Sequence, residues 1–292
     1  MKQVTLTSPS KVNLFLEVLG RRDDGYHEIC SIVALTELCD TIVLERRTSG
    51  ITIWSQDPKV PCGSDNLCYR AADLLLRHSG VHGGVSIRIE KHIPIAGGMG
   101  GGSSNAATTL WGLNLLYDLG WPREELIDLG SELGSDVPLF FCRGAAFIRG
   151  RGERVEELAA LTPQWLVIAN PGIEIATASV YRRLRLPLTS EKAGFTMRGL
   201  VESGQEEAAL SHCFNRLEDV VLEAYPSVAN LKQRLLLLGA SPVLVSGSGP
   251  TVFGIMREAE TAKRVALSLV ENGIAAVACR TLERNPLLTT GQ

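Results

Sequence analysis

The chain of 292 residues lacks the surplus of positive charge that nucleic-acid-binding proteins carry, because its formal net charge is −3. It also lacks an apolar run of about 18 residues, the length that predicts a membrane-spanning helix. Residues 1–10 contain one lysine and no apolar stretch, so we expect no signal peptide there. These absences argue against nucleic acid and membrane as partners and predict a cytoplasmic protein. Because the net charge is slightly negative, any anionic substrate must be met by local positive charge.

The chain also has no Cys-x-x-Cys pair, although it contains seven cysteines. Their number is odd and they are scattered along the sequence: Cys30, Cys39, Cys62, Cys68, Cys142, Cys213 and Cys279. A disulfide framework or a structural zinc site would need paired, regularly spaced cysteines. The pattern therefore predicts free thiols in a reducing cytosol.

Three common nucleotide-binding signatures are missing as well. There is no Gly-Lys dipeptide, which excludes a Walker A loop. Gly98-Met99-Gly100 is followed three residues later by Ser103 rather than glycine, so the dinucleotide fingerprint fails. The His-Arg-Asp and Asp-Phe-Gly motifs of protein kinases are absent.

What the chain does have is a glycine-rich run between a predicted strand and a predicted helix. Five of the six residues from Gly97 to Gly102 are glycine. Glycine lets backbone N–H groups approach a ligand, and the N-terminus of a helix adds partial positive charge, so the run predicts a phosphate cradle. The alternative is a flexible turn with a helix cap. The predicted ATP-binding residues are Pro94, Ile95, Ala96, Gly97, Gly98, Met99, Gly100, Gly101, Gly102, Ser103 and Ser104.

Hydrophobic periodicity predicts an α+β protein in two lobes that share one interface. A change in composition near residues 156–164 divides the chain into an ATP-binding lobe, 1–158, and a second lobe, 159–292. The predicted strands are 12–18, 41–45, 51–54, 85–89, 145–149, 165–169, 243–245, 251–256 and 274–280. The predicted helices are 66–76, 104–117, 123–133, which stops at a C′ glycine, Gly134, then 218–225, 227–238 and 262–269.

Three segments in this order resemble the motifs of the galactokinase, homoserine kinase, mevalonate kinase and phosphomevalonate kinase (GHMP) superfamily. Segment Ser8–Leu14 resembles the first motif of the superfamily, Pro94–Ser104 resembles the central motif, and Val245–Phe253 resembles the third motif. The resemblance covers the whole chain. It implies an N-terminal lobe of mixed sheet and helices and a C-terminal ferredoxin-like α+β lobe. It also implies transfer of the ATP γ-phosphate to a hydroxyl of a small alcohol.

Two further segments are similar to one family of that superfamily, the 4-diphosphocytidyl-2-C-methyl-D-erythritol kinases. They are Gly25–His27, which follows Arg21–Asp24, and Leu133–Pro138. The resemblance implies ATP and Mg²⁺ as requirements and a cytidine-diphosphate-linked sugar alcohol as substrate. It implies phosphorylation of the 2-hydroxyl in the non-mevalonate pathway of isoprenoid biosynthesis. One departure is Ala96, where the family commonly has glycine. We expect the methyl group to be tolerated if φ is negative there.

The resemblance gives the role of general base to Asp136 and makes Lys11 its partner. Taken alone, Asp136 two residues before a proline is more typical of a helix N-cap. Lys11 taken alone predicts an exposed lysine on an edge strand. In the functional interpretation, the Lys11 ammonium lies beside Asp136 and the acceptor hydroxyl, where both would assist proton removal.

The remaining site residues also rest on the resemblance. Tyr26 and His27 would hold the cytosine, and Tyr181 would close the other side of the base. Asn13 would bond the erythritol end. Segment 65–67 would lie near adenine, although we favour an N-cap of the next helix. The sequence indicates no firm protein ligand for Mg²⁺, and Ser104 is one candidate. The arginines Arg149, Arg151 and Arg154 could form a basic patch for a diphosphate, but we favour the interpretation that they lie in a solvated turn.

Two other functions remain open on sequence grounds. The chain could be a GHMP kinase for another alcohol, of the mevalonate or homoserine type. It could instead be a nucleotide-binding protein that has lost catalysis on the same fold. The presence of both Lys11 and Asp136 argues against the second alternative.

Overall fold

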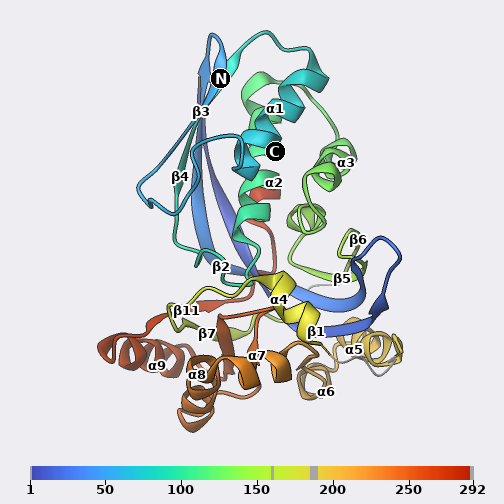
Figure 1. Ribbon diagram of the computed structural model, residues 1–292, viewed down its shortest axis with the longest axis vertical. Coiled ribbons are helices and arrows are strands. Elements are labelled where there is room, and N and C mark those ends of the chain that lie inside the picture. The colour runs from blue at the N-terminus through green and yellow to red at the C-terminus, as the bar shows by residue number, and fades with distance from the viewer. Residues whose placement is uncertain (1, 159–160, 185–189, 290–292) are drawn as a thin grey trace.

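The computed structural model describes residues 2–158, 161–184 and 190–289 and builds them around two sheets (Figure 1). The strands are β1 (Gln3–Arg21), β2 (His27–Arg47), β3 (Gly50–Ser55), β4 (Gly84–Glu90), β5 (Ala145–Gly150), β6 (Arg154–Glu157), β7 (Trp165–Asn170), β8 (Phe214–Asn215), β9 (Val243–Val245), β10 (Val252–Met256) and β11 (Ala275–Arg280). The helices are α1 (Leu67–Ser79), α2 (Gly101–Tyr117), α3 (Arg123–Leu133), the 3₁₀ helix η1 (Pro138–Phe141), α4 (Thr177–Arg183), α5 (Lys192–Glu202), α6 (Glu206–Ser211), α7 (Glu218–Ala224), α8 (Pro226–Leu237), α9 (Ala259–Glu271) and α10 (Pro286–Thr289).

The first sheet has seven strands, in the order β3-β4-β2-β1-β8, with β5 on β2 and β6 on β5. Its centre is the antiparallel pair of β1 and β2, whose register shifts at three places, between Pro9 and Ser10, Asn13 and Phe15, and Val18 and Gly20. Residues 8–18 of β1 are all buried. A strand that alternates between a core face and a solvent face would not show this, so both faces of β1 are covered by protein.

Helices α1, α2 and α3 lie together on one side of this sheet (Figure 1). Helix α2 approaches the strands closely because residue 112 is glycine. A Cβ atom at Gly112 would lie 2.5 Å from Leu44 Cδ1 and 2.7 Å from Leu6 Cδ1. The depth at which α2 packs also fixes the position of its N-terminus, where the glycine-rich run enters the helix.

The second sheet has four antiparallel strands in the order β11-β7-β10-β9. Numbered within the lobe this is 4-1-3-2, with helices after the first and third strands, which is the ferredoxin-like arrangement. Val12 of β1 packs in one buried cluster with Ile168 and Phe253 of the second sheet. The two sheets therefore share a core through β1. The expected α+β architecture of two lobes with a ferredoxin-like second lobe is confirmed.

Most predicted elements are confirmed with small shifts at their ends, and α3 has the predicted bounds. The predicted end of α3 at Gly134 is confirmed, and the backbone there is extended, with a φ of 173°. Helix α2 begins at Gly101 instead of residue 104 because the last glycines are already helical. The predicted division after residue 158 stays a prediction, since residues 159–160 lie outside the described residues. Among described residues, no helix is long and apolar enough to cross a membrane.

Candidate active site

A cleft of about 1360 Å³ collects residues from both lobes. Its lining consists of Lys11, Asn13, Arg21, Gly25, Tyr26, His27, Lys59, Asp65, Asn66, Leu67, Lys91, Pro94–Ser103, Asn105, Ser135, Asp136, Arg151, Ile175–Ala178, Tyr181, Arg182, Gly247 and Ser248, with a few apolar neighbours. The glycine-rich run and the residues expected to act on phosphate, hydroxyl and base thus open into one space. The structure brings together all predicted site residues except Ser104.

Carbonyl oxygens of the glycine-rich run accept hydrogen bonds from both lobes. The Lys11 amide donates to Met99 O at 3.1 Å, and the Ser246 hydroxyl donates to Gly98 O at 3.1 Å. Gly98 has a φ of +74°, and a Cβ atom there would overlap the Ser246 carbonyl oxygen. Only glycine therefore allows this approach between the second and third motifs.

The N-terminus of α2 is open at the cleft. Gly100 precedes the helix with a φ of +71° and provides no side-chain cap, so the first-turn amides have no capping partner from a side chain. Uncapped amides and the helix dipole at the end of a 17-residue helix form a ready anion site. The run can therefore hold phosphate with backbone groups alone.

Two residues of the run differ from expectation. Ala96 has a φ of +52°, so the condition under which its methyl group is tolerated without strain is not met. Left-handed backbone is unfavourable for residues with a Cβ atom, because that atom crowds the following carbonyl oxygen. Ser104 is fully buried, and its hydroxyl bonds the Ser8 hydroxyl at 2.7 Å instead of facing the cleft.

Lys11 is buried and not an exposed edge-strand residue, so that alternative is wrong. It is 7% exposed on the central strand β1. Its ammonium donates to Asn13 Oδ1 at 2.5 Å. Burial lowers the pKa of Lys11, and the negative charge of Asp136 opposes this by raising it. The two groups are therefore close enough to interact across the cleft.

Asn13 connects this lysine to the backbone. Its amide nitrogen donates to the Ser31 hydroxyl at 2.9 Å, and that hydroxyl donates to Phe15 O at 2.6 Å. The Asn13 side chain, expected to bond substrate, thus already orients Lys11. Sequence reasoning missed Ser31, because a serine within an apolar strand gives no signal of its partner across the sheet.

Asp136 lies in the turn between α3 and η1. Its carboxylate accepts no hydrogen bond from any described residue, and Val137, not Asp136, occupies the N-cap position of η1. The alternative interpretation as a helix cap is therefore wrong. The backbone of Gly152 packs against this carboxylate, since a Cβ atom there would lie 3.2 Å from Asp136 Oδ1. The carboxylate is left with open lone pairs at the cleft.

The aromatic residues gather at another part of the cleft. The rings of His27 and Tyr181 stack with centroids 4.8 Å apart and planes 31° apart, so Tyr181 contacts His27 directly and leaves no gap for a base between them. Burial, with Arg21 nearby, lowers the pKa of His27. Burial raises the pKa of Tyr181, and the Asp136 charge adds to the rise. Tyr26 is 53% exposed, with the Arg151 guanidinium 5.2 Å from its ring centroid.

Segment 65–67 both caps a helix and lines the cleft. Asn66 Oδ1 accepts from the Cys68 amide at 2.8 Å, and its amide nitrogen donates to Pro61 O at 2.7 Å. The predicted N-cap of α1 is confirmed. The same three residues lie on the cleft wall, so a role near a nucleotide stays open to them.

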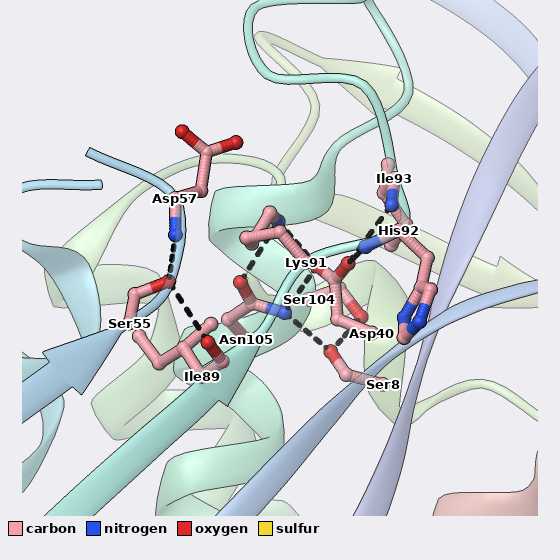
Figure 2. A network of polar contacts seen from close by, with 10 residues as sticks. All are labelled: Ser8, Asp40, Ser55, Asp57, Ile89, Lys91, His92, Ile93, Ser104 and Asn105. Atoms are coloured by element: carbon pink, nitrogen blue, oxygen red, sulfur yellow. Dashed lines mark hydrogen bonds and ion pairs between the residues drawn. The ribbon is translucent and has the colours of Figure 1, made fainter. Parts of the chain in front are cut away.

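A buried carboxylate organises the segment before the glycine-rich run (Figure 2). Asp40 is fully buried and accepts from the amides of His92 at 2.7 Å and Ile93 at 2.9 Å. It also accepts from Asn105 Nδ2 at 2.9 Å and pairs with the Lys91 ammonium. A Cβ atom at Gly101 would lie 3.2 Å from that ammonium, so its charge sits beside the start of α2. The sequence signal was weak, because Asp40 is one of four acidic residues along β2 and nothing in the sequence marks it as buried.

The third motif is held in place by the buried side-chain amide of Asn215. Asn215 Nδ2 donates to Val245 O and to Gly247 O, both at 2.8 Å. Glu218 Oε2 accepts from the Val245 amide at 2.8 Å. Sequence reasoning singled out neither side chain, because both act through backbone groups that are distant in sequence.

Comparison with known proteins identifies both lobes. Residues 66–144 match the GHMP kinases N terminal domain and residues 197–275 match GHMP kinases C terminal. A 4-diphosphocytidyl-2-C-methyl-D-erythritol kinase of Geobacter metallireducens is 43% identical over 273 residues, covering 93% of this chain and 96% of that protein. The protein of the same name from Alkaliphilus metalliredigens is 43% identical over 265 residues, covering 90% and 91%.

Solved structures agree with this result. A crystal structure of 4-(cytidine 5'-diphospho)-2C-methyl-D-erythritol kinase matches with a TM-score of 0.79 at 36% identity, covering 96% of this chain and 99% of that one. Homoserine kinase from Cytophaga hutchinsonii matches with a TM-score of 0.77 at 17% identity, covering 98% and 96%, which shows likeness of fold alone. With both domains matched and close relatives aligned over nearly their full length, the chain belongs to the 4-diphosphocytidyl-2-C-methyl-D-erythritol kinase family of the GHMP kinases.

Proposed function

We propose that this chain transfers the γ-phosphate of ATP to the 2-hydroxyl of 4-diphosphocytidyl-2-C-methyl-D-erythritol, in the non-mevalonate pathway of isoprenoid biosynthesis. Membership of the family supports this reaction. The observation that carries the proposal is that Lys11, Asp136 and the glycine-rich run line one cleft. The charge of Asp136 also acts on the Lys11 ammonium.

The ATP phosphates would lie on the N-terminus of α2. The uncapped amides after Gly100 supply donors, and the helix dipole supplies partial positive charge. The Lys91 ammonium, which is paired with Asp40, also lies beside Gly101 at the start of the helix. The segment 65–67 on the cleft wall is available to the adenosine.

Asp136 would accept the proton of the substrate hydroxyl. Phosphoryl transfer depends mainly on positioning and on stabilising charge, and a positioned base adds to both. The Asp136 carboxylate is suited to this because no described residue occupies its lone pairs. Lys11, held by Asn13, would place its ammonium where negative charge develops on the transferring group.

Mg²⁺ would enter with ATP. No group of three or more His, Cys, Asp or Glu among the described residues could hold a metal ion. Mg²⁺ usually keeps several waters and binds substrate phosphates with few protein ligands, so the phosphates of ATP would supply most of its ligands. When bound, the ion neutralises charge on the phosphates.

Recognition of the cytosine would fall to the aromatic part of the cleft. Tyr26 exposes half of its ring, which offers a stacking face to a base. His27 and Tyr181 form one stacked pair that can border the same base. We place the reaction in the cytoplasm, because all seven cysteines are free thiols.

The test is to incubate the purified chain with ATP, Mg²⁺ and the cytidylated methylerythritol and to follow ADP release. We expect turnover that falls by about 10²- to 10⁴-fold in Asp136→Asn, the range for loss of a general base. If wild type turns over the substrate no faster than the Asp136→Asn variant, the assignment is wrong. Mevalonate and homoserine serve as alternative acceptors, and ATP binding without transfer to any acceptor would indicate a non-catalytic protein.

A further inference from the structure

The hairpin between β5 and β6 presents an arginine at its tip. Gly150 and Gly152 have φ angles of +75° and +119°, so the turn tightens at two glycines on either side of Arg151. The Arg151 amide donates to Glu153 Oε2 at 2.7 Å, which closes the turn from within. The backbone at this tip is thus fixed, while the arginine side chain is exposed at the cleft.

This hairpin tip lies between Asp136 and Tyr26, two residues of the candidate active site. On one side the backbone of Gly152 packs against the carboxylate of Asp136. On the other side the Arg151 guanidinium lies 5.2 Å from the centre of the Tyr26 ring. The hairpin tip therefore borders the carboxylate proposed to receive the hydroxyl proton, through Gly152, and the aromatic ring proposed to hold the base, through Arg151.

The other two arginines of this segment are engaged elsewhere. Arg149 Nη2 pairs with Glu156 at 2.5 Å, and Arg154 lies 3.9 Å from Glu153. The Arg151 guanidinium makes no ion pair or hydrogen bond with any of the described residues. The charge of Arg151 acts on the Asp24 carboxylate, but the two groups form no ion pair. Of the three arginines, Arg151 is therefore the cation that faces the cleft and is available to bind a ligand there.

We propose that Arg151 binds the diphosphate of the substrate. This inference rests on the proposed function, because the substrate carries its diphosphate between the cytidine and the sugar alcohol. With the base near Tyr26 and the hydroxyl at Asp136, the diphosphate lies beside the hairpin tip. A guanidinium can donate two parallel hydrogen bonds to phosphate oxygens. The Arg151 side chain is long enough to move from the exposed Tyr26 ring to those oxygens.

The first test compares steady-state kinetics of Arg151→Ala, Arg151→Lys and the matched control Arg154→Ala. We expect the KM for the cytidylated substrate to rise about 10-fold or more in Arg151→Ala, as for loss of a charge-assisted hydrogen bond, and less in Arg151→Lys. The KM for ATP stays unchanged, and Arg154→Ala behaves as wild type. An equal rise in the KM for ATP overturns the inference, because it would assign Arg151 to the other phosphates.

The second test measures binding of CDP and of cytidine by calorimetry. We expect Arg151→Ala to weaken CDP by about 10-fold or more and to leave cytidine unchanged. If wild type turns over the substrate while Arg151→Ala binds CDP equally well, the inference fails and the proposed function stands. If wild type neither binds CDP nor turns over the substrate, the proposed function itself fails. A melting temperature equal to that of wild type shows that the variant is folded.

Discussion

The Lys11 ammonium donates a hydrogen bond to Asn13 Oδ1 at 2.5 Å, between two side chains on the same strand. Residues two apart on a strand point to the same face, so the pair enters the cleft together. Ser31 fixes Asn13 from the neighbouring strand. The orientation of the proposed catalytic lysine is thus set by a hydrogen-bond chain rather than by an ion pair.

Asn13→Ala should lower kcat by about 10- to 100-fold, because Lys11 loses its acceptor and a buried donor is left unsatisfied at about 1–3 kcal/mol. If Asn13 instead acts chiefly on substrate, the variant will raise the KM for the sugar alcohol and leave kcat near wild type. Steady-state kinetics separate the two roles. Asn272→Ala, whose amide only caps the exposed end of α9, is the control.

The pH dependence of kcat/KM should carry an alkaline limb from Lys11. Burial lowers its pKa below the ordinary lysine value of 10.5, so the ammonium is lost as pH rises through a value below that. Between the lowered pKa of Lys11 in the folded chain and its ordinary pKa in the unfolded chain, the unfolded chain binds more protons. The free energy of unfolding therefore rises with pH in this interval while activity falls. Lys11→Arg keeps its charge and should lose the limb although its rate is lower. A midpoint at or above 10.5 in wild type contradicts this assignment.

Two glycines of the run should respond oppositely to alanine. At Gly98 a Cβ atom would overlap the Ser246 carbonyl oxygen, and φ is +74°. We expect Gly98→Ala to destabilise the protein by about 2 kcal/mol or more, as strain and displaced backbone add. At Gly102 a Cβ atom would meet Leu67 Cδ1 at an ordinary 3.8 Å. Gly102→Ala lies in a helix and should be neutral or up to about 1 kcal/mol more stable. Urea unfolding without nucleotide measures both, and equal effects would contradict the explanation.

The sequence predicted most helices and strands well, because the periodic positions of their apolar residues are the positions that are buried in the folded chain. The 85–89 alternation and the 123–133 stripe each bury one face, which is the condition under which such patterns are informative. The long strands β1 and β2 extended far beyond their predicted cores. Residues 8–18 are buried on both faces, so the alternation that marks a half-exposed strand is absent.

The place of Gly98 in the cleft could be predicted from a local motif and that of Asp136 from the family resemblance, while the roles of both stay predictions. The site was not predictable where distant residues meet. Ser31, Asp40 and Asn215 act through partners between 16 and 65 positions away in sequence, so only the folded chain reveals their roles. The φ at Ala96 was also beyond reach, because a single alanine carries no sign of a left-handed turn.

Ala96→Gly should stabilise the chain. The residue has a φ of +52°, where an L-residue with a Cβ atom costs about 1–2 kcal/mol relative to right-handed backbone. Glycine removes that cost but gains freedom in the unfolded state, worth about 0.4–1 kcal/mol, so we expect a net gain of about 0.5–1 kcal/mol. Urea unfolding gives the value. A loss of stability in Ala96→Gly would mean that the methyl group contributes packing that outweighs the strain.

Asp40→Asn tests the buried network that precedes the glycine-rich run. The Asp40 side chain is fully buried and that of Lys91 is 8% exposed, so the variant leaves a buried ammonium without its counter-charge. Loss of one partner of a buried pair costs about 3–5 kcal/mol, and we expect the unfolding free energy to fall by that amount. The KM for ATP should also rise, because a neutral amide oxygen accepts more weakly than a carboxylate from the His92 and Ile93 amides, so the segment before the run is held less firmly.

The double variant Asp40→Asn/Lys91→Met separates charge from shape. It removes both charges, so we expect it to recover much of the stability lost in Asp40→Asn, since replacing both partners of a buried pair is often tolerated. Asp128→Asn, an exposed acid on α3, should leave both stability and the KM for ATP unchanged. A double variant no more stable than Asp40→Asn would show that the carboxylate acts through its bonds to the two backbone amides, because those bonds are weakened equally in both proteins.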